Sequence, residues 1–156
     1  MTVTQQSIDG APALRLERRL NHSIERVWRA VTEPQELARW FVVDEVPWTP
    51  QQDEEFEAGG ETGRITELDP PRRLAWTWGP ERYSFDLSAD NDDTTTLVFT
   101  HVFNPELGPG YQHAAGWDAY FDRLEAHLQG GFLSEEDAHR RMDERLANYR
   151  ERFTTA

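Results

Sequence analysis

Hydrophobic and polar residues alternate near the start of the chain. In LRLERRL, residues 14–20, the leucines and Arg18 fall on one side of an extended chain, and the other charged residues fall on the opposite side. This period of two predicts a half-buried β-strand. Residues 1–12 show no clear pattern, and we expect a flexible N-terminal arm there.

The next segment changes to a helical period. Ser23 is a suitable N-cap, and the hydrophobic residues within 24–31 recur three and four positions apart. Pro34 ends this helix and fits the first turn of another, in which Trp40 and Phe41 share a face. We therefore expect two short helices directly after the first strand.

From about residue 54 to residue 103 the alternation returns in short runs. Gly59-Gly60, the DPP sequence at residues 69–71 and the ADNDD sequence at residues 89–93 separate these runs as turns. Each run gathers hydrophobic residues, many of them aromatic, on one face, and the last run places His101 between Phe99 and Phe103. Such a series is typical of an antiparallel sheet with one aromatic face.

Two helical patterns complete the chain. The first has one stripe of five residues, namely His113, Trp117, Phe121, Leu124 and Leu128. It predicts a helix of about 18–20 residues, roughly 30 Å long, which Gly130-Gly131 would end. The second pattern predicts a helix at about residues 134–153 that starts with Ser134 and an acidic first turn. No linker divides the chain, so residues 13–156 are expected to form a single domain.

The order of elements predicts an α+β fold. A curved antiparallel β-sheet would wrap around the long C-terminal helix, with two short helices after the first strand and an extra helix at the C-terminus. The aromatic face of the sheet is the natural partner for the stripe of the long helix, and a strongly twisted sheet curls around such a helix. A cavity can remain where sheet and helix diverge.

Composition and charge exclude several classes of chemistry. The 156 residues suit one domain with a real core, and the 12% of aromatic residues indicates that large rings fill or line the interior. The chain has no cysteine and no lysine, which rules out disulfides, thiolate catalysis, cysteine zinc sites and lysine Schiff bases. A formal net charge of −13 disfavours nucleic acids and anionic membrane surfaces as partners. Without a signal peptide or a membrane-spanning run, we expect a cytoplasmic protein.

Three stretches carry a family resemblance. NHSIERVWRAVTEPQELARWF, GRITELDPPRRLAWTW and HAAGWDAYFDRLEAHL resemble bacterial single-domain relatives of the activator of the 90-kDa heat-shock chaperone's ATPase. That family belongs to the START-like, helix-grip (SRPBCC) superfamily, with the birch-pollen-allergen proteins and polyketide cyclases. The resemblance covers about residues 13–130. It implies a helix-grip fold with an apolar ligand cavity, and it implies neither a reaction nor a catalytic residue.

The two histidines that flank the loop between the last strand and the long helix are the candidate polar groups. His101 and His113 should both point into the gap between sheet and helix. A metal site would need more ligands, and Glu67 and Glu106 stand at no recognised spacing, so we predict neither a metal nor a cofactor. A catalytic pair lacks a nucleophile, and each histidine taken alone could be a core residue bonded to backbone or water. For the pair we favour a third interpretation, in which both histidines are polar residues in the aromatic wall of a ligand pocket.

The hypothesis for function is binding, either to sequester or to sense a small apolar, aromatic or lipid-like molecule, and we assign no catalytic residue. The residues expected to line the ligand site are Trp40, Phe56, Trp76, Trp78, Phe85, Phe99, His101, His113, Trp117 and Phe121. One alternative is an enzyme of the polyketide cyclase or dehydratase type with a pocket histidine as acid or base. Another is a module that regulates a chaperone ATPase in a stress response. We expect a monomer or a homodimer.

Overall fold

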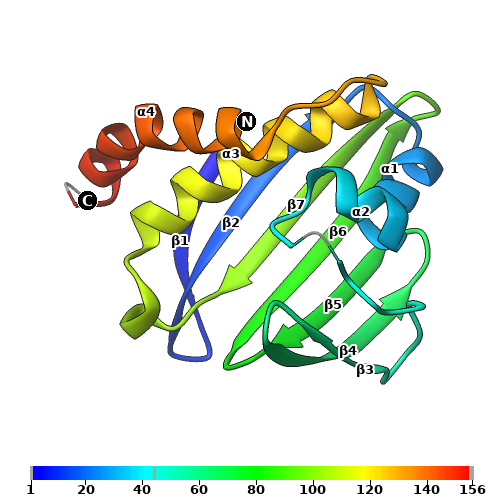
Figure 1. Cartoon of the computed structure of the whole chain (residues 1–156), viewed down its shortest axis with the longest axis horizontal. Coiled ribbons are helices and arrows are strands. Elements are labelled where there is room, and N and C mark those ends of the chain that lie inside the picture. The colour runs from blue at the N-terminus through cyan, green and yellow to red at the C-terminus, as the bar shows by residue number, and fades with distance from the viewer. Residues whose placement is uncertain (1, 44, 155–156) are drawn as a thin grey trace.

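The fold is a seven-stranded antiparallel sheet that curves around a long helix (Figure 1). The computed structural model describes residues 2–43 and 45–154. Its strands run in the order β1-β2-β7-β6-β5-β4-β3 across the sheet. The elements are β1 (Thr2–Ile8), β2 (Ala11–Leu20), α1 (Ile24–Thr32), α2 (Pro34–Trp40), β3 (Glu55–Ala58), β4 (Glu61–Asp69), β5 (Arg73–Trp78), β6 (Glu81–Asn91), β7 (Thr94–Val102), the 3-10 helix η1 (Pro105–Leu107), α3 (Gly110–Leu128) and α4 (Glu135–Thr154).

Helix α3 lies across the inner face of the sheet, with α1 and α2 beside it and α4 along it (Figure 1). This arrangement confirms the predicted α+β helix-grip class, with the two short helices after β2 and the long helix after β7. The predicted N-caps are present, because the hydroxyl of Ser23 accepts from the backbone N–H of Arg26 and that of Ser134 from the N–H of Asp137.

The core forms between the aromatic face of the sheet and the stripe of α3. Phe85 and Phe99 on the sheet and Trp40 and Phe121 on the helices are all within 1% of complete burial. Their rings pack directly on one another, with centroids 5.2 Å apart for Phe99 and Phe121 and 5.6 Å apart for Trp40 and Phe121. Complete burial of a side chain of this size contributes about 1.5–3 kcal/mol, so this cluster fixes where α3 sits.

The prediction of a flexible N-terminal arm is wrong. Residues Thr2–Ile8 form β1, which pairs with β2 in register from Thr2 opposite Glu17 to Ile8 opposite Ala11. The strand escapes a search for alternation because it lies at the sheet edge, where most of its polar side chains face solvent and Val3 is the buried residue. The turn signal was present, since Asp9-Gly10 adopts the two positive φ angles that a tight hairpin requires.

Helix α4 packs on α3 through both apolar and charged groups. Ala138 and Tyr149 are its buried residues, and Met142, Leu146 and Phe153 are partly buried against the core. The Tyr149 hydroxyl donates to Asp118 over 2.7 Å, and Arg141 and Arg145 of α4 both reach Asp122 over 2.8 Å. The docking of α4 therefore combines ion pairs with a narrow apolar stripe.

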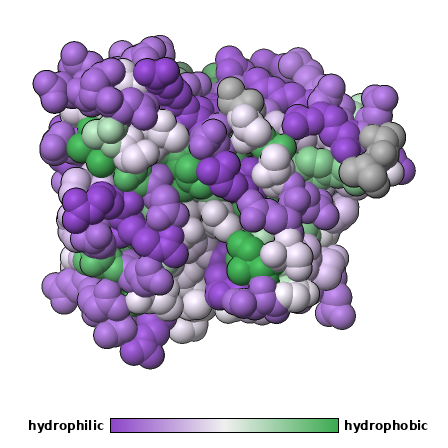
Figure 2. All heavy atoms as spheres, turned by 180° about the vertical axis from the view of Figure 1, so that it is seen from behind, coloured by the Kyte–Doolittle hydropathy of each residue, from purple (hydrophilic) through white to green (hydrophobic). Residues whose placement is uncertain are grey.

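The back of the molecule is mostly hydrophilic. Figure 2 shows its hydrophobic residues as separate spots among polar ones rather than as one continuous patch. The large hydrophobic side chains that stay exposed in the described part of the chain are Leu107 and Phe132. Within residues 2–43 and 45–154, no helix has the length and hydrophobicity needed to cross a bilayer.

Candidate functional site

A cavity of about 260 Å³ lies where the β5–β6 end of the sheet faces the N-terminal half of α3. Its wall combines residues of the sheet, of α3 and of the segment after α2. They are Val42, Trp78, Glu81, Tyr83, His101, Gln112, His113, Gly116, Trp117 and Tyr120. This is the gap between sheet and helix in which the sequence placed its two candidate histidines.

Strand alternation brings the sheet residues to this wall. Glu81 and Tyr83 lie four and two positions before Phe85, so all three project from the inner face of β6. His101 lies two positions after Phe99 on β7 and stands directly opposite Tyr83 in the strand register. The rings of Tyr83 and His101 stack with centroids 4.4 Å apart, which continues the aromatic core up to the cavity.

Glu81 is a buried carboxylate with three hydrogen-bond donors. One oxygen accepts from His101 Nε2 at 2.8 Å and from the Tyr83 hydroxyl at 3.0 Å, and the other accepts from the backbone N–H of Asn104 at 2.8 Å. Burial alone would raise the pKa of Glu81, but these hydrogen bonds lower it from 4.5 to about 2. The side chain therefore carries its negative charge at any physiological pH.

The partners of His101 fix its tautomer. Trp117 Nε1–H donates to His101 Nδ1 over 3.0 Å, so Nδ1 carries no proton. The ring proton is then on Nε2, which donates to Glu81. Both ring nitrogens are used, and the imidazole is neutral. His101 is thus a fixed part of the cavity wall.

The Tyr83 hydroxyl also stays a donor. Burial and the adjacent Glu81 charge both raise the pKa of Tyr83 far above its ordinary value. Its ring lies between Trp76, with which it stacks at 5.3 Å, and His101. The carboxylate, the phenol, the imidazole and the indole together form one satisfied hydrogen-bond network, which we call the carboxylate cluster (Glu81, Tyr83, His101 and Trp117).

His113 differs from His101. Its ring lies 5.0 Å from that of His101 and 4.9 Å from that of Phe103, and its buried Nε2 atom has no hydrogen-bond partner among the described residues. Burial lowers the pKa of His113 below 6.5, so the imidazole is neutral at neutral pH. A buried polar atom left unpaired costs about 1–3 kcal/mol, so a functional reason for this residue is worth seeking.

Four of the ten predicted ligand-site residues line the cavity, namely Trp78, His101, His113 and Trp117. The other six lie in the packed interior: Trp40, Phe56, Trp76, Phe85, Phe99 and Phe121. Trp76 and Phe56, for example, both pack on Trp48, with ring centroids 5.6 and 5.2 Å away. Contact between any of the ten and a ligand stays a prediction.

Sequence reasoning missed the carboxylate of this wall. Glu81 stands at the position where the inward-facing series of β6 would begin, so a charged residue continues an otherwise apolar face. Charged residues are rarely buried without a specific partner. The position of Glu81 on this face could therefore have indicated a functional or paired carboxylate. Tyr120 was missed as well, although it lies one residue from Phe121 and its hydroxyl contacts His139 of α4 at 3.4 Å.

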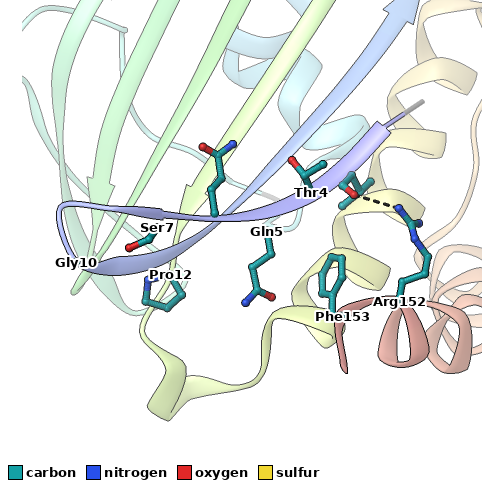
Figure 3. A pocket seen from close by; sticks show the side chains of 9 residues that line it. Thr4, Gln5, Ser7, Gly10, Pro12, Arg152 and Phe153 are labelled. Atoms are coloured by element: carbon teal, nitrogen blue, oxygen red, sulfur yellow. Dashed lines mark hydrogen bonds between the residues drawn. The ribbon is translucent and has the colours of Figure 1, made fainter. Parts of the chain in front are cut away.

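Other hollows are less suited to a small molecule. A larger groove of about 690 Å³ runs between β1 and the end of α4 (Figure 3). The polar residues of β1 form much of it, and its one charged side chain, Arg152, already donates to the backbone carbonyl of Val3 at 3.1 Å. No three His, Asp or Glu side chains in the described ranges are placed together to hold a metal ion.

Comparisons with known proteins agree on family and fold. The model of the family described as "Activator of Hsp90 ATPase homolog 1-like protein" matches residues 21–129. No curated protein matches the chain. The crystal structure of CalU16 from Micromonospora echinospora is 24% identical with a TM-score of 0.77, and the match covers 96% of this chain and 94% of that one.

Two further solved structures show the same fold. EF2215 of Enterococcus faecalis, a conserved protein of unknown function, is 22% identical with a TM-score of 0.75 over 98% of this chain and 91% of its own. DynU16, from the dynemicin biosynthetic locus, is 24% identical with a TM-score of 0.64 over 80% of this chain and 50% of its own. At these identities the likeness concerns the fold alone.

Proposed function

The chain belongs to the activator of Hsp90 ATPase homolog 1-like family, and we propose that it binds a small, mostly apolar ligand in the cavity beside His101 and His113. Ligand sites are concave, largely apolar and furnished with a few placed polar groups. The volume of about 260 Å³ is just below the usual range for such sites, which begins near 300 Å³. Because an apolar cavity of about 150 Å³ accepts benzene, we infer a ligand with one or two rings or of similar size.

The state of the polar atoms in the wall carries this proposal. In the carboxylate cluster every donor meets an acceptor inside the wall. The Trp78 indole N–H is likewise used, since it donates to the carbonyl of Ala58 at 2.8 Å. The rings therefore present hydrocarbon surface to the cavity, and a ligand gains by burying its own apolar surface there.

The same observations favour binding over acid–base catalysis. His101 could accept a proton only by giving up its bond from Trp117. Glu81 is ionised and Tyr83 is held protonated, so neither supplies a proton at neutral pH. His113 is the one neutral imidazole in the wall with a nitrogen free of hydrogen bonds, and a base without an acid or a nucleophile makes an incomplete catalytic site.

The chaperone-regulating alternative finds less support on the surface. A module of that kind needs an exposed apolar patch to bind its partner, and the exposed large hydrophobic residues of the described chain are Leu107 and Phe132. They lie before and after α3, whose 19 residues span roughly 28 Å. The guanidinium groups of Arg39 and Arg123 also lie over the Phe132 ring, 4.9 and 5.6 Å from its centroid.

Titration of the protein with benzyl alcohol, indole and 1-naphthol, followed by the indole N–H signals in NMR, tests the proposal. Trp78 and Trp117 line the cavity, whereas Trp40 is fully buried elsewhere with its N–H on the Ala30 carbonyl. We expect saturable shifts of the Trp78 and Trp117 signals, with dissociation constants of about 10 µM to 1 mM. The Trp40 signal is the internal control. If no probe gives a saturable shift at millimolar concentration, the proposal is wrong.

A further inference from the structure

Among the described residues that line the cavity, Glu81 carries a negative charge and none carries a positive charge. Glu81 is ionised, and the hydrogen-bond pattern makes His101 a neutral imidazole. His113 is neutral at neutral pH because its pKa is lowered. None of the described residues that line the cavity is an arginine, and the chain contains no lysine. The described wall of this cavity therefore contains one full charge, the negative charge of Glu81.

The donors around Glu81 do not cancel its charge. Tyr83, His101 and the Asn104 backbone N–H are all neutral groups, so they stabilise the carboxylate as dipoles and leave one full negative charge at the wall. A neutral apolar molecule gains nothing from that charge. A cation placed nearby gains directly, since charges interact strongly where water is displaced.

Aromatic rings supply the second half of a cation site. Trp78 and Trp117 line the cavity on either side, one from the end of β5 and one from α3. Indole is the ring that attracts ammonium groups most strongly, through the negative face of its π system. Tyr120 is a weaker wall, since the Arg123 guanidinium already lies 5.5 Å from its ring. Trp78 and Trp117 are therefore the rings on which the argument rests.

We propose that this cavity selects ligands that carry an ammonium group, held by the indoles of Trp78 and Trp117 beside the Glu81 carboxylate. The proposal rests on the proposed binding function and adds the charge of the ligand to it. An organic ammonium suits both features of the site, because its alkyl groups bury against the rings while its charge faces Glu81. The formal net charge of −13 on the whole chain also attracts cations toward the surface from a distance.

A matched pair of probes isolates the charge. Choline and 3,3-dimethylbutan-1-ol have the same shape and differ by a quaternary nitrogen in place of a quaternary carbon. Titrations of the wild-type protein, followed by the Trp78 and Trp117 indole signals, should show choline binding at least about tenfold more tightly than its neutral isostere. This measurement needs no variant, so it stands even if a substitution at the site prevents folding.

Three variants then locate the preference. Glu81→Gln removes the charge at similar size, and it should bring choline and the alcohol to within about twofold of each other. Trp78→Leu should weaken choline about tenfold and the alcohol less. Trp28→Leu is the matched control, because Trp28 is a half-buried tryptophan of α1 that does not line the cavity. It should leave both probes unchanged.

The outcomes separate this proposal from the one before it. Equal or tighter binding of the neutral alcohol by the wild-type protein overturns the ammonium preference and leaves the apolar binding site standing. A preference for choline that survives unchanged in Glu81→Gln and Trp78→Leu also overturns it, because the cation would then bind elsewhere. If none of choline, the alcohol and the uncharged aromatic probes binds, both proposals fail.

Discussion

Two buried polar clusters meet α3, and they differ in how their charges are balanced. In the ionic cluster, Arg18 of β2 pairs with Asp118 at 2.8 Å, with Asp122 at 3.0 Å and with Glu125 at 3.1 Å, and Arg141 and Arg145 of α4 complete the set. Opposite charges face one another, and the groups join β2, α3 and α4. In the carboxylate cluster a single charge, Glu81, is surrounded by neutral donors at the edge of a cavity.

This difference in charge balance distinguishes a cluster that holds structural elements together from a cluster that can bind a ligand. A balanced set of ion pairs has little attraction left for an outside molecule, and its value is to hold three elements in place. Burying an unbalanced charge in an aromatic wall destabilises the fold, because the charge loses its contact with water, and its hydrogen bonds offset this cost. The charge still attracts an oppositely charged group of a ligand. The first cluster should therefore matter most for stability, and the second for both stability and binding.

The largest effect is expected for Arg18→Met. This change leaves Asp118 and Asp122 buried with fewer positive partners, and breaking a buried ion pair from one side costs about 3–5 kcal/mol. Arg19→Met is the matched control, because the neighbouring side chain is 67% exposed and its pair with Asp90 spans 3.4 Å. That control should stay within about 0.5 kcal/mol of the wild type. The free energy of unfolding is measured with denaturant. If both variants lose the same amount of it, the ionic cluster does not hold β2, α3 and α4 together.

Glu81→Gln should come next and depend on pH. The folded pKa of Glu81 is about 2 against an ordinary value of 4.5, so its charge stabilises the fold fully above pH 4.5 and progressively less as the pH falls toward 2. The expected cost at pH 7 is on the order of 3 kcal/mol. Unfolding measured at pH 7 and pH 3 should show the gap to the wild type shrinking in acid. A gap of the same size at both values contradicts the assignment, and the exposed Glu57→Gln is the control.

His101→Phe tests the neutral half of the carboxylate cluster. The ring keeps its stacking on Tyr83, but the Trp117 N–H loses its acceptor and Glu81 loses one donor. The expected loss is about 1–3 kcal/mol, the range for a buried polar group left unpaired. The Trp117 indole proton should also change its NMR shift and exchange faster with solvent. An unchanged Trp117 signal would mean that the hydrogen bond to His101 does not exist.

The overall fold could be predicted because it depends on periodicity. The change from period two to helical spacing marked β2, β7 and α3, and Ser23 and Ser134 marked two helix starts. Strand β1 was not predicted, because an edge strand shows little alternation of hydrophobic and polar residues. Backbone hydrogen bonds with β2 hold this strand in the sheet, and the pattern of side chains in the sequence does not reveal them.

The site could be predicted only in part, because partners far apart in sequence create it. Alternation put Arg18 on the buried face of its strand, but nothing local shows that Asp118, one hundred residues later, would receive it. The stripe and the strand alternation predicted that His101 and His113 would point into one gap, and both side chains line the same cavity. Their different chemistry was not predictable, since it depends on the Trp117 bond and on Glu81 across the sheet.

The smallest effect on stability is expected for His113→Phe, and its direction is opposite to that of the other variants, because this change should stabilise the fold. Within the described part of the chain, the buried Nε2 of this imidazole has no hydrogen-bond partner, so replacing the imidazole by an apolar ring should stabilise the fold by up to about 1 kcal/mol at pH 7.5. The folded pKa of His113 is lowered, mainly by burial, and the unfolded chain therefore binds more protons as the pH falls below 6.5. The wild type should lose stability there relative to the variant, and the gap should widen between pH 7.5 and pH 5.5. Glu81 and His101, the titratable groups facing this ring, remain in both proteins, so the difference isolates His113. A variant that is less stable than the wild type at both pH values would show that His113 has a polar partner after all and shares the structural role of His101.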